Sequence, residues 1–287
     1  MQEIALGSNE MTSYEKAQPS IAFIGAGNMA KAIITGLVES GYPAEKIIAT
    51  NRTVEKLQLL SSSLGINTSL SNAEAASKSD IIVLAVKPAV VTDVCAEMAE
   101  QIDKQVIISV AAGITIKLIQ KHLKTNNAVV RAMPNTPCLL SKGTIGIFAE
   151  QDVKSQQLDF IDSLFGNIGE IVWISTEDKM DIVTALSGSG PAYFFYLTEA
   201  LIKAGTNLGL EEEVSSKLVN QTALGAVTML NDKPLQSATS LREAVTSPNG
   251  TTAAALKVFD DNNLMDIVSS AIDNATQRGK EMSKQAE

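Results

Sequence analysis

The chain has 287 residues but only one histidine, one tryptophan and two cysteines. Two cysteines cannot build a disulfide framework, and nothing gives them metal-ligand spacing, so we expect no metal site. We interpret Cys95 and Cys138 as packed thiols of a protein in the reducing cytoplasm. The single histidine, His122, lies in a charged helical stretch and is expected at the surface.

Positive charge and long apolar runs are also scarce. Lys and Arg number 23 against 32 Asp and Glu, which gives a net charge of −9. Such an acidic chain lacks the basic face that non-specific nucleic-acid binding requires. No apolar run approaches the roughly 18 residues of a membrane span. Residues 1–19 are polar and lack the apolar core of a signal peptide, so we interpret them as an N-terminal extension.

Hydrophobic residues make up 45% of the chain, enough for a packed core. From residue 20 to residue 175, short apolar strands alternate with helical stretches, which predicts an α/β domain with a parallel, doubly wound sheet. From residue 176 to residue 287 only helical patterns occur, which predicts an all-α second domain. Strands are expected at residues 21–25, 46–50, 80–86, 106–110, 128–131, 144–149 and 168–174. Helices are expected at residues 29–40, 54–64, 180–186, 193–208, 211–230, 234–245, 251–260 and 264–284.

A glycine-rich turn follows the first predicted strand and opens a helix. It has the pattern G-x-G-x-x-A and consists of Gly25, Ala26, Gly27, Asn28, Met29 and Ala30. Small residues let the backbone approach a pyrophosphate, and the helix start supplies free N–H groups and positive charge. In this context the pattern favours dinucleotide binding over a merely tight strand–helix turn.

The end of the second predicted strand bears on which dinucleotide binds. An NAD site usually places Asp or Glu there, to bond the ribose 2′-hydroxyl. This chain has no acid at that point, where Asn51 and Arg52 stand. Arg52 can clamp a 2′-phosphate, so we expect NADPH to be preferred over NADH. The alternative is that Arg52 is a solvated charge at a helix start.

Further ligand-binding positions follow from the rule that open α/β sheets bind ligands outside the carboxyl ends of their strands. Two predicted strands end in short segments that we expect to line the ribose and the nicotinamide. Lys87 is either a donor to the coenzyme or a surface lysine. The two segments are Ala85, Val86, Lys87 and Pro88, and Ala111, Ala112 and Gly113.

Two turn-rich loops lie in the predicted helical domain. Residues 246–252 lead into a helix, and the unpaired N–H groups at its start suit a small carboxylate, although an ordinary capped turn has the same composition. Residues 187–191 (SGSGP) bring backbone close either to the nicotinamide or to another helix.

Several strings now coincide, and together they resemble the Δ1-pyrroline-5-carboxylate reductase family. The resemblance runs from about residue 21 to residue 278. It implies a Rossmann domain followed by a helical domain that intertwines with a second subunit, in dimers that assemble further to decamers. It also implies reduction of the cyclic imine 1-pyrroline-5-carboxylate to L-proline with NAD(P)H. The strings are FIGAGNMA (23–30), LAVKP (84–88), SVAAGIT (109–115), MPNTP (133–137), ALSGSGPAY (185–193) and AVTSPNGTTAAAL (244–256).

The resemblance also assigns roles by position. Asn72 belongs at the adenosine end of the coenzyme, Asn135 near the nicotinamide, and Thr252 on the ring nitrogen of the substrate. Asn249 stands where the family usually has glycine, and asparagine tolerates the left-handed backbone that such a loop needs. The substrate-binding set is Val245, Thr246, Ser247, Asn249, Gly250, Thr251, Thr252 and Ser189.

The scarcity of acid–base groups separates the possible reactions. A hydroxy-acid dehydrogenase must move a proton to or from an oxygen, usually with His or Lys. An imine is protonated before hydride arrives, so a site of hydroxyls, glycines and amides can act by positioning alone. The alternatives are a β-hydroxyacid dehydrogenase using Lys179 or Lys203, and an NADP-binding sensor without turnover.

Overall fold

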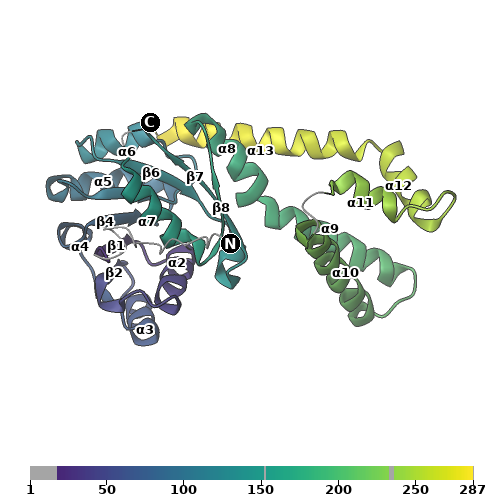
Figure 1. The fold of residues 1–287 in the computed structure, drawn as a ribbon, viewed down its shortest axis with the longest axis horizontal. Coiled ribbons are helices and arrows are strands. Elements are labelled where there is room, and N and C mark those ends of the chain that lie inside the picture. The colour runs from purple at the N-terminus through teal and green to yellow at the C-terminus, as the bar shows by residue number, and fades with distance from the viewer. Residues whose placement is uncertain (1–17, 152, 233–235, 287) are drawn as a thin grey trace, which may run out of the picture. The chain divides into compact units, whose positions relative to one another are not determined.

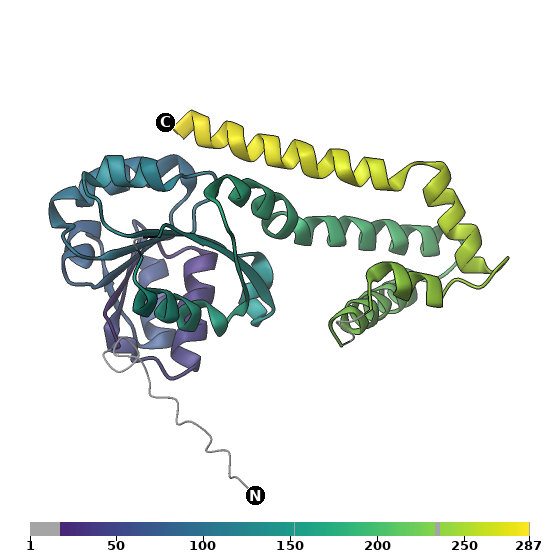
Figure 2. The same cartoon turned by 45° about the horizontal axis from the view of Figure 1, so that its top comes forward.

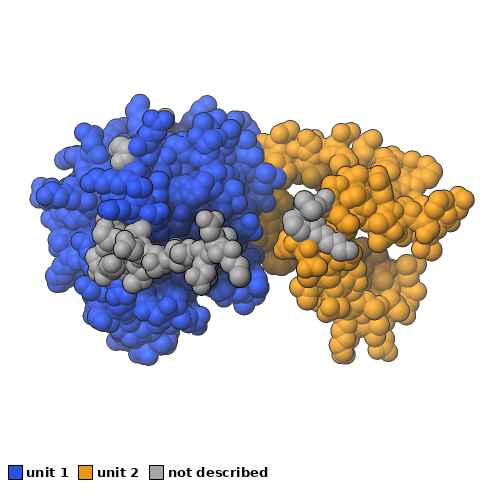
Figure 3. All heavy atoms as spheres, in the orientation of Figure 1, with its two compact units in different colours: residues 1–188, 275–287 blue, residues 189–274 orange. Residues whose placement is uncertain are grey.

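The computed structural model describes residues 18–151, 153–232 and 236–286. It divides into two compact units, one of residues 1–188 with 275–287 and one of residues 189–274 (Figure 3). This division falls later than the boundary expected near residue 175, because the segment that follows the last strand packs on the sheet. The last helix also returns to the first unit. Most of the predicted extension, residues 1–17, lies outside the described residues.

The first unit is built on one eight-stranded sheet, in the order β3-β2-β1-β4-β5-β6-β7-β8. The first six strands are parallel, as predicted. β7 runs antiparallel to β6, because residues 134–142 join them without a crossover α-helix, and β8 pairs parallel with β7. The strands are β1 (Ile21–Ile24), β2 (Ile47–Thr50), β3 (Asn67–Ser69), β4 (Ile81–Leu84), β5 (Val106–Ser109), β6 (Val129–Met133), β7 (Gly143–Ala149) and β8 (Gly169–Trp173).

Helices cover both faces of this sheet (Figures 1 and 2). α2 (Asn28–Glu39), α3 (Val54–Leu64) and α7 (Ser155–Gly166) contribute to one buried cluster, which also holds Ile21 and Phe23 of β1. α4 (Asn72–Ser77), α5 (Val91–Met98) and α6 (Ile116–Leu123) contribute to the other, with Ala22 and Ile24. Successive residues of a strand point to opposite faces, so β1 is buried on both sides.

Short helical turns complete the first unit. The 3-10 turns are η1 (Ala44–Lys46), η2 (Pro88–Val90), η3 (Ala99–Gln101), η4 (Thr136–Leu140) and η5 (Glu177–Lys179). The single helix predicted at residues 180–186 is in fact α8 (Met180–Val183) followed by a π-helical turn, η6 (Thr184–Gly188). Such turns are frequent at functional sites.

The two cysteines and the single histidine all lie in the first unit. Cys95 and Cys138 are both buried and form no disulfide, which confirms packed thiols. His122 lies on α6 and is half-buried, so it reaches the surface only in part. Its helix presents one face to the sheet, and His122 lies at the edge of that face, next to buried Leu123.

The regular secondary structure of the second unit is all helical in the residues that the structure describes. It contains α9 (Gly190–Asn207), α10 (Glu212–Asp232), α11 (Ala238–Ala244), α12 (Thr251–Asp261) and the first part of α13 (Leu264–Ala286). The helix predicted at residues 234–245 corresponds to α11, and its predicted first residues, 234–235, lie outside the described residues. No described helix has the length and apolar character of a membrane span.

This helical unit has almost no core of its own. In α9 and α10 the buried residues are Gly190 and Ser215, both small. Large apolar side chains along α9 are exposed instead, with Phe195 at 68% and Tyr196 at 76%. Since burial of apolar surface is the main favourable term in folding, these faces need a covering surface from outside the unit.

Candidate functional site

The glycine turn predicted from the sequence lies against the end of a neighbouring strand. Gly25 has a φ of +100°, which disfavours other residues. A β-carbon placed on Gly25 would lie 2.8 Å from the carbonyl oxygen of Ala85 and 2.9 Å from Cγ1 of Val86. The turn and the segment after β4 are therefore in contact, as the rule on carboxyl ends predicts.

The start of α2 leaves backbone donors open. Gly27 is the N-cap and supplies no side-chain hydrogen bond, so the first N–H groups of α2 have no intrahelical acceptor. A β-carbon on Gly27 would meet no atom within 4 Å, and Asn28 is exposed. Ala26, Gly27 and Asn28 line a cavity of about 210 Å³ together with Lys31 and Lys56. Free N–H groups and two ammonium groups together suit an anion.

A chain of hydrogen bonds fixes the expected adenosine end of this site. The hydroxyl of Thr50, at the end of β2, accepts the Gly25 N–H at 3.3 Å and donates to Oδ1 of Asn72 at 2.6 Å. The amide of Asn72 donates in turn to Glu97 at 3.1 Å. Asn72 thus lies beside the glycine turn and holds it through Thr50.

The segment after β2 carries a cation and no acid. Oδ1 of Asn51 accepts the Thr53 N–H at 2.9 Å, which fixes the turn into α3. Arg52 is exposed, and within the described residues no ion pair involves it. Its guanidinium is therefore available to an anionic ligand.

Two further predicted segments lie at the carboxyl ends of β4 and β5, which are adjacent strands. Lys87 is exposed and precedes Pro88, the first residue of η2. Ala111 is 7% exposed, Ala112 is half-buried, and Gly113 is buried with a φ of +70°. Hereafter residues 111–113 are the 111–113 loop. Together with the glycine turn after β1, these segments lie at the carboxyl ends of three adjacent strands, where a flat ligand can approach.

Asn135 has a different environment from the one expected of a coenzyme ligand. Its amide nitrogen donates to the carbonyl oxygen of Ser187 at 3.1 Å, and its Oδ1 accepts the Thr144 N–H at 2.9 Å. Both ends of the amide therefore bind protein, and they tie the π-helical turn η6 to the start of β7. A β-carbon on Gly188 would lie 2.5 Å from Cε of Met133, so this turn packs tightly on β6.

The predicted substrate loop lies in the helical unit, between α11 and α12. Asn249 has a φ of +59°, so asparagine adopts the left-handed backbone expected there. The Gly250 N–H donates to the carbonyl of Ser247 at 3.0 Å, and Gly250 caps α12 without a side-chain bond. Thr251 is exposed and Thr252 is half-buried. The start of α12 thus resembles that of α2.

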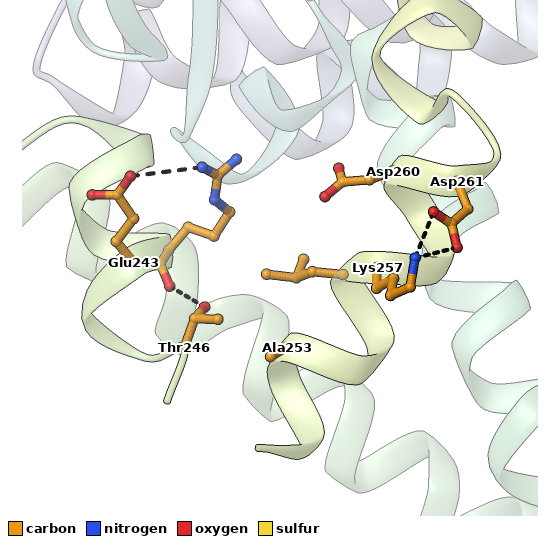
Figure 4. Close-up of a pocket in the computed structure, with 8 residues that line it drawn as sticks. Glu243, Thr246, Ala253, Lys257, Asp260 and Asp261 are labelled. Carbon is orange, nitrogen blue, oxygen red and sulfur yellow. Dashed lines mark hydrogen bonds and ion pairs between the residues drawn. The ribbon is translucent and has the colours of Figure 1, made fainter. Parts of the chain in front are cut away.

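Figure 4 shows the cavity of about 580 Å³ beside this loop, between α11 and α12. Of the predicted substrate residues only Thr246 lines it, and its hydroxyl donates to the carbonyl of Arg242. The rest of the lining is Arg242, Glu243, Ala253, Leu256, Lys257, Asp260 and Asp261. Lys257 pairs with Asp261 at 2.9 Å. The other predicted substrate residues lie elsewhere: Val245 is exposed, and Ser189 is half-buried before α9.

Four residues near the glycine turn were not expected from the sequence. Thr50 and Glu97 enter through hydrogen bonds between elements that are distant in the chain, and no local pattern signals such bonds. Lys31 lies about one helical turn into α2, and Lys56 lies near the start of α3. The distance of each lysine along the chain from the glycine turn is the only feature of the sequence that could have indicated its place in this site.

Fold and site together define a class: an oxidoreductase with a Rossmann-type dinucleotide-binding domain and a helical domain that lacks its own core. Residues 20–113 match the family described as NADP oxidoreductase, coenzyme F420-dependent, and residues 177–282 match pyrroline-5-carboxylate reductase dimerisation. The chain belongs to the pyrroline-5-carboxylate reductase family.

Relatives of this family cover nearly the whole chain. The pyrroline-5-carboxylate reductase of Pseudomonas aeruginosa is 43% identical over 93% of this chain and 98% of its own length. Pyrroline-5-carboxylate reductase 1 of Bacillus subtilis is 37% identical, with 94% and 91% covered. The solved structure from Coxiella burnetii has a TM-score of 0.87 at 41% identity, with 93% and 99% covered. The Plasmodium falciparum structure with NADP bound has a TM-score of 0.83 at 31% identity, with 92% and 98% covered.

Proposed function

We propose that this chain reduces 1-pyrroline-5-carboxylate to L-proline with a nicotinamide coenzyme, the final step of proline biosynthesis. The observation that carries the proposal is a pair of glycine-capped helix starts, at Gly27 and at Gly250, each with unpaired backbone donors. One suits a pyrophosphate and the other a small carboxylate. Membership of the reductase family supports both assignments.

The residues of the first unit fit such a coenzyme. The open space beside Gly27 admits backbone close to a pyrophosphate, and Gly25, Ala26, Asn28 and Met29 complete that turn. Asn51, Arg52 and Asn72 hold the adenosine end. Asn135 supports the nicotinamide end indirectly, through its hydrogen bond to the carbonyl oxygen of Ser187. The residues that line the nicotinamide end are Ala85, Val86, Lys87, Pro88, Ala111, Ala112 and Gly113. When bound, the reduced coenzyme supplies the hydride.

NADPH is the preferred coenzyme in this proposal. Residues 50–53 contain no carboxylate to bond a ribose 2′-hydroxyl, whereas Arg52 is exposed and free of ion pairs in the described part of the chain. Lys56 adds a second positive charge on the next helix. A guanidinium binds the 2′-phosphate of NADPH with two parallel hydrogen bonds. The uncharged 2′-hydroxyl of NADH cannot form this pair.

The substrate binds by its carboxylate at the start of α12. Ser247, Asn249, Gly250 and Thr251 surround the unpaired N–H groups of this helix, and Val245, Thr246 and Ser189 complete the set. The Thr252 hydroxyl accepts a hydrogen bond from the protonated ring nitrogen and orients the C=N bond. The protein moves no proton of its own, because a protonated imine becomes an amine on hydride addition. The chain therefore acts by orientation.

The active assembly is proposed to be a homodimer in the cytoplasm. The exposed apolar side chains of α9 and α10 need a covering surface, and a second copy of the same unit provides one. The cytoplasmic location is supported by two buried thiols without a disulfide. Further assembly to a decamer rests on the family resemblance.

Coenzyme oxidation tests the reaction. NADPH should be consumed with pyrroline-5-carboxylate, with L-proline formed in equal amount. Reduction of NADP⁺ by 3-hydroxyisobutyrate would identify a β-hydroxyacid dehydrogenase instead. Binding of NADPH without turnover of either substrate would identify a sensor.

The role of Thr252 has its own test. Thr252→Ala should lower kcat/KM for pyrroline-5-carboxylate by about tenfold to a hundredfold, because a directed hydrogen bond is worth about 1.5–3 kcal/mol where one partner is charged. Thr252→Ser keeps the hydroxyl and is the matched control. Full catalytic efficiency in Thr252→Ala would remove the assigned role.

A further inference from the structure

A buried ion pair lies outside the residues given a role so far. Arg131 on β6 is 5% exposed, and its Nη1 lies 2.9 Å from Oε1 of Glu177 in η5. A guanidinium removed from water is costly unless it is paired and hydrogen-bonded. The position of Glu177 is therefore fixed by the sheet.

The same carboxylate oxygen has a second partner. Oε1 of Glu177 also accepts the N–H of Ile116 at 2.8 Å. Ile116 is the first residue of α6, so this N–H is one of the donors that the helix leaves unpaired, and the positive helix end favours a carboxylate there. Ile114 and Thr115 join the 111–113 loop to Ile116. Glu177 thus fixes the point at which the loop enters α6.

The other side of the loop packs on the last helix. A β-carbon placed on Gly113 would lie 3.4 Å from the carbonyl oxygen of Gly279, from Cβ of Met282 and from Oγ of Ser283. One placed on Gly279 would lie 3.0 Å from Oδ1 of Asp181, in α8. The loop therefore lies next to the end of α13 on one side, and on the other the Glu177 carboxylate holds the helix start that follows the loop.

We propose that Glu177, with Arg131 as its buried counter-ion, is a positioning residue that fixes the 111–113 loop for the nicotinamide end of the coenzyme. This inference rests on the proposed function, which places the nicotinamide against that loop. Neither side chain is assigned contact with reacting atoms. Their effect passes through the Ile116 N–H to the backbone of the loop.

Three substitutions of Glu177 separate geometry from charge. Glu177→Gln keeps the length of the side chain and an acceptor oxygen for both partners but removes the charge. Glu177→Asp keeps the charge but is one methylene too short to hold both contacts at 2.8 and 2.9 Å. Glu177→Ala removes both. Glu170→Gln, an exposed carboxylate on β8, is the matched control.

The experiment combines kinetics with two binding measurements on the full chain. kcat/KM is measured with NADPH and pyrroline-5-carboxylate. Calorimetry then compares the dissociation constant of NADPH with that of adenosine 2′,5′-bisphosphate, which is the adenosine half of the coenzyme and lacks the nicotinamide. Glu177→Ala should lower kcat/KM by about a hundredfold, the effect of a displacement of about 1 Å at a reacting centre. Glu177→Asp should behave similarly, Glu177→Gln should retain most of the activity, and Glu170→Gln should match the unsubstituted protein.

In all variants adenosine bisphosphate should bind as it does to the unsubstituted protein, while NADPH binds more weakly to Glu177→Ala and Glu177→Asp. Greater activity in Glu177→Asp than in Glu177→Gln would overturn the inference, because charge rather than reach would then matter. Equally weakened binding of NADPH and adenosine bisphosphate would also overturn it. If Glu177→Ala fails to fold, the relative activities of Glu177→Gln and Glu177→Asp decide. An unsubstituted protein without turnover would refute the proposed function, and the binding comparison would still test the loop.

Discussion

The two glycines of the turn before α2 should fail in different ways when each is replaced by alanine. Gly25→Ala places a methyl group 2.8 Å from the Ala85 carbonyl oxygen on a backbone with a φ of +100°. The backbone conformation costs about 1–2 kcal/mol and overpacking about 1–3 kcal/mol, so the free energy of unfolding should fall by about 2–5 kcal/mol. For a chain of this size that lowers Tm by about 4–20 °C.

Gly27→Ala is the matched control. Its φ is −82°, and its methyl group meets no protein atom within 4 Å, so Tm without coenzyme should change little. The methyl group lies where the backbone must approach a pyrophosphate, and the NADPH Kd should rise by about 5–150-fold, the equivalent of about 1–3 kcal/mol. Thermal unfolding without coenzyme and NADPH titration measure the two effects. Equal Tm losses in both variants, or unchanged NADPH affinity in Gly27→Ala, would refute this account of the turn.

Three other predictions concern the coenzyme, the thiols and the assembly. Arg52→Ala should lower kcat/KM with NADPH by about tenfold to a hundredfold and leave that with NADH unchanged, since a bond to a charged partner is worth about 1.5–3 kcal/mol; an unaltered ratio of the two efficiencies would exclude the clamp. Burial raises the pKa of Cys95 to about 12 and raises that of Cys138, so at pH 8 neither should react with a disulfide reagent until the chain unfolds. Rapid native labelling would contradict their burial. Dilution until light scattering detects monomers should abolish activity, and a fully active monomer would show that the exposed faces of α9 and α10 need no partner.

Much of the first unit follows from its sequence because burial on both faces leaves a strong pattern. The bounds of α3, Val54–Leu64, are those predicted, and β4 lies within the predicted apolar run. β3, α4 and α7 were not predicted individually, and of α6 only the charged helical stretch around His122 was predicted. β3 is a polar edge strand of three residues, Asn67–Ser69, and α4 is a helix of six, so neither is long enough to show periodicity.

The parts of the site that are formed by backbone turns and strand ends could be predicted from the sequence. The hydrogen bonds and ion pairs between side chains could not. The glycine turn and the two strand ends follow from the rule on parallel sheets. The bond between Thr50 and Asn72 depends on which strands and helices become neighbours, and so does the pairing of Arg131 with Glu177, 46 residues apart. The sequence shows an arginine in a strand but not the carboxylate that makes its burial tolerable.

A crystal structure with NADP⁺ and L-proline bound tests the central claim most directly, because that claim is that two glycine-capped helix starts hold the two ligands. We predict the pyrophosphate at the N–H groups of α2, the nicotinamide against the 111–113 loop, and the proline carboxylate at the start of α12 with its ring nitrogen on Thr252. Proline bound away from the start of α12, or a coenzyme that does not touch the Gly25 turn, would contradict the account.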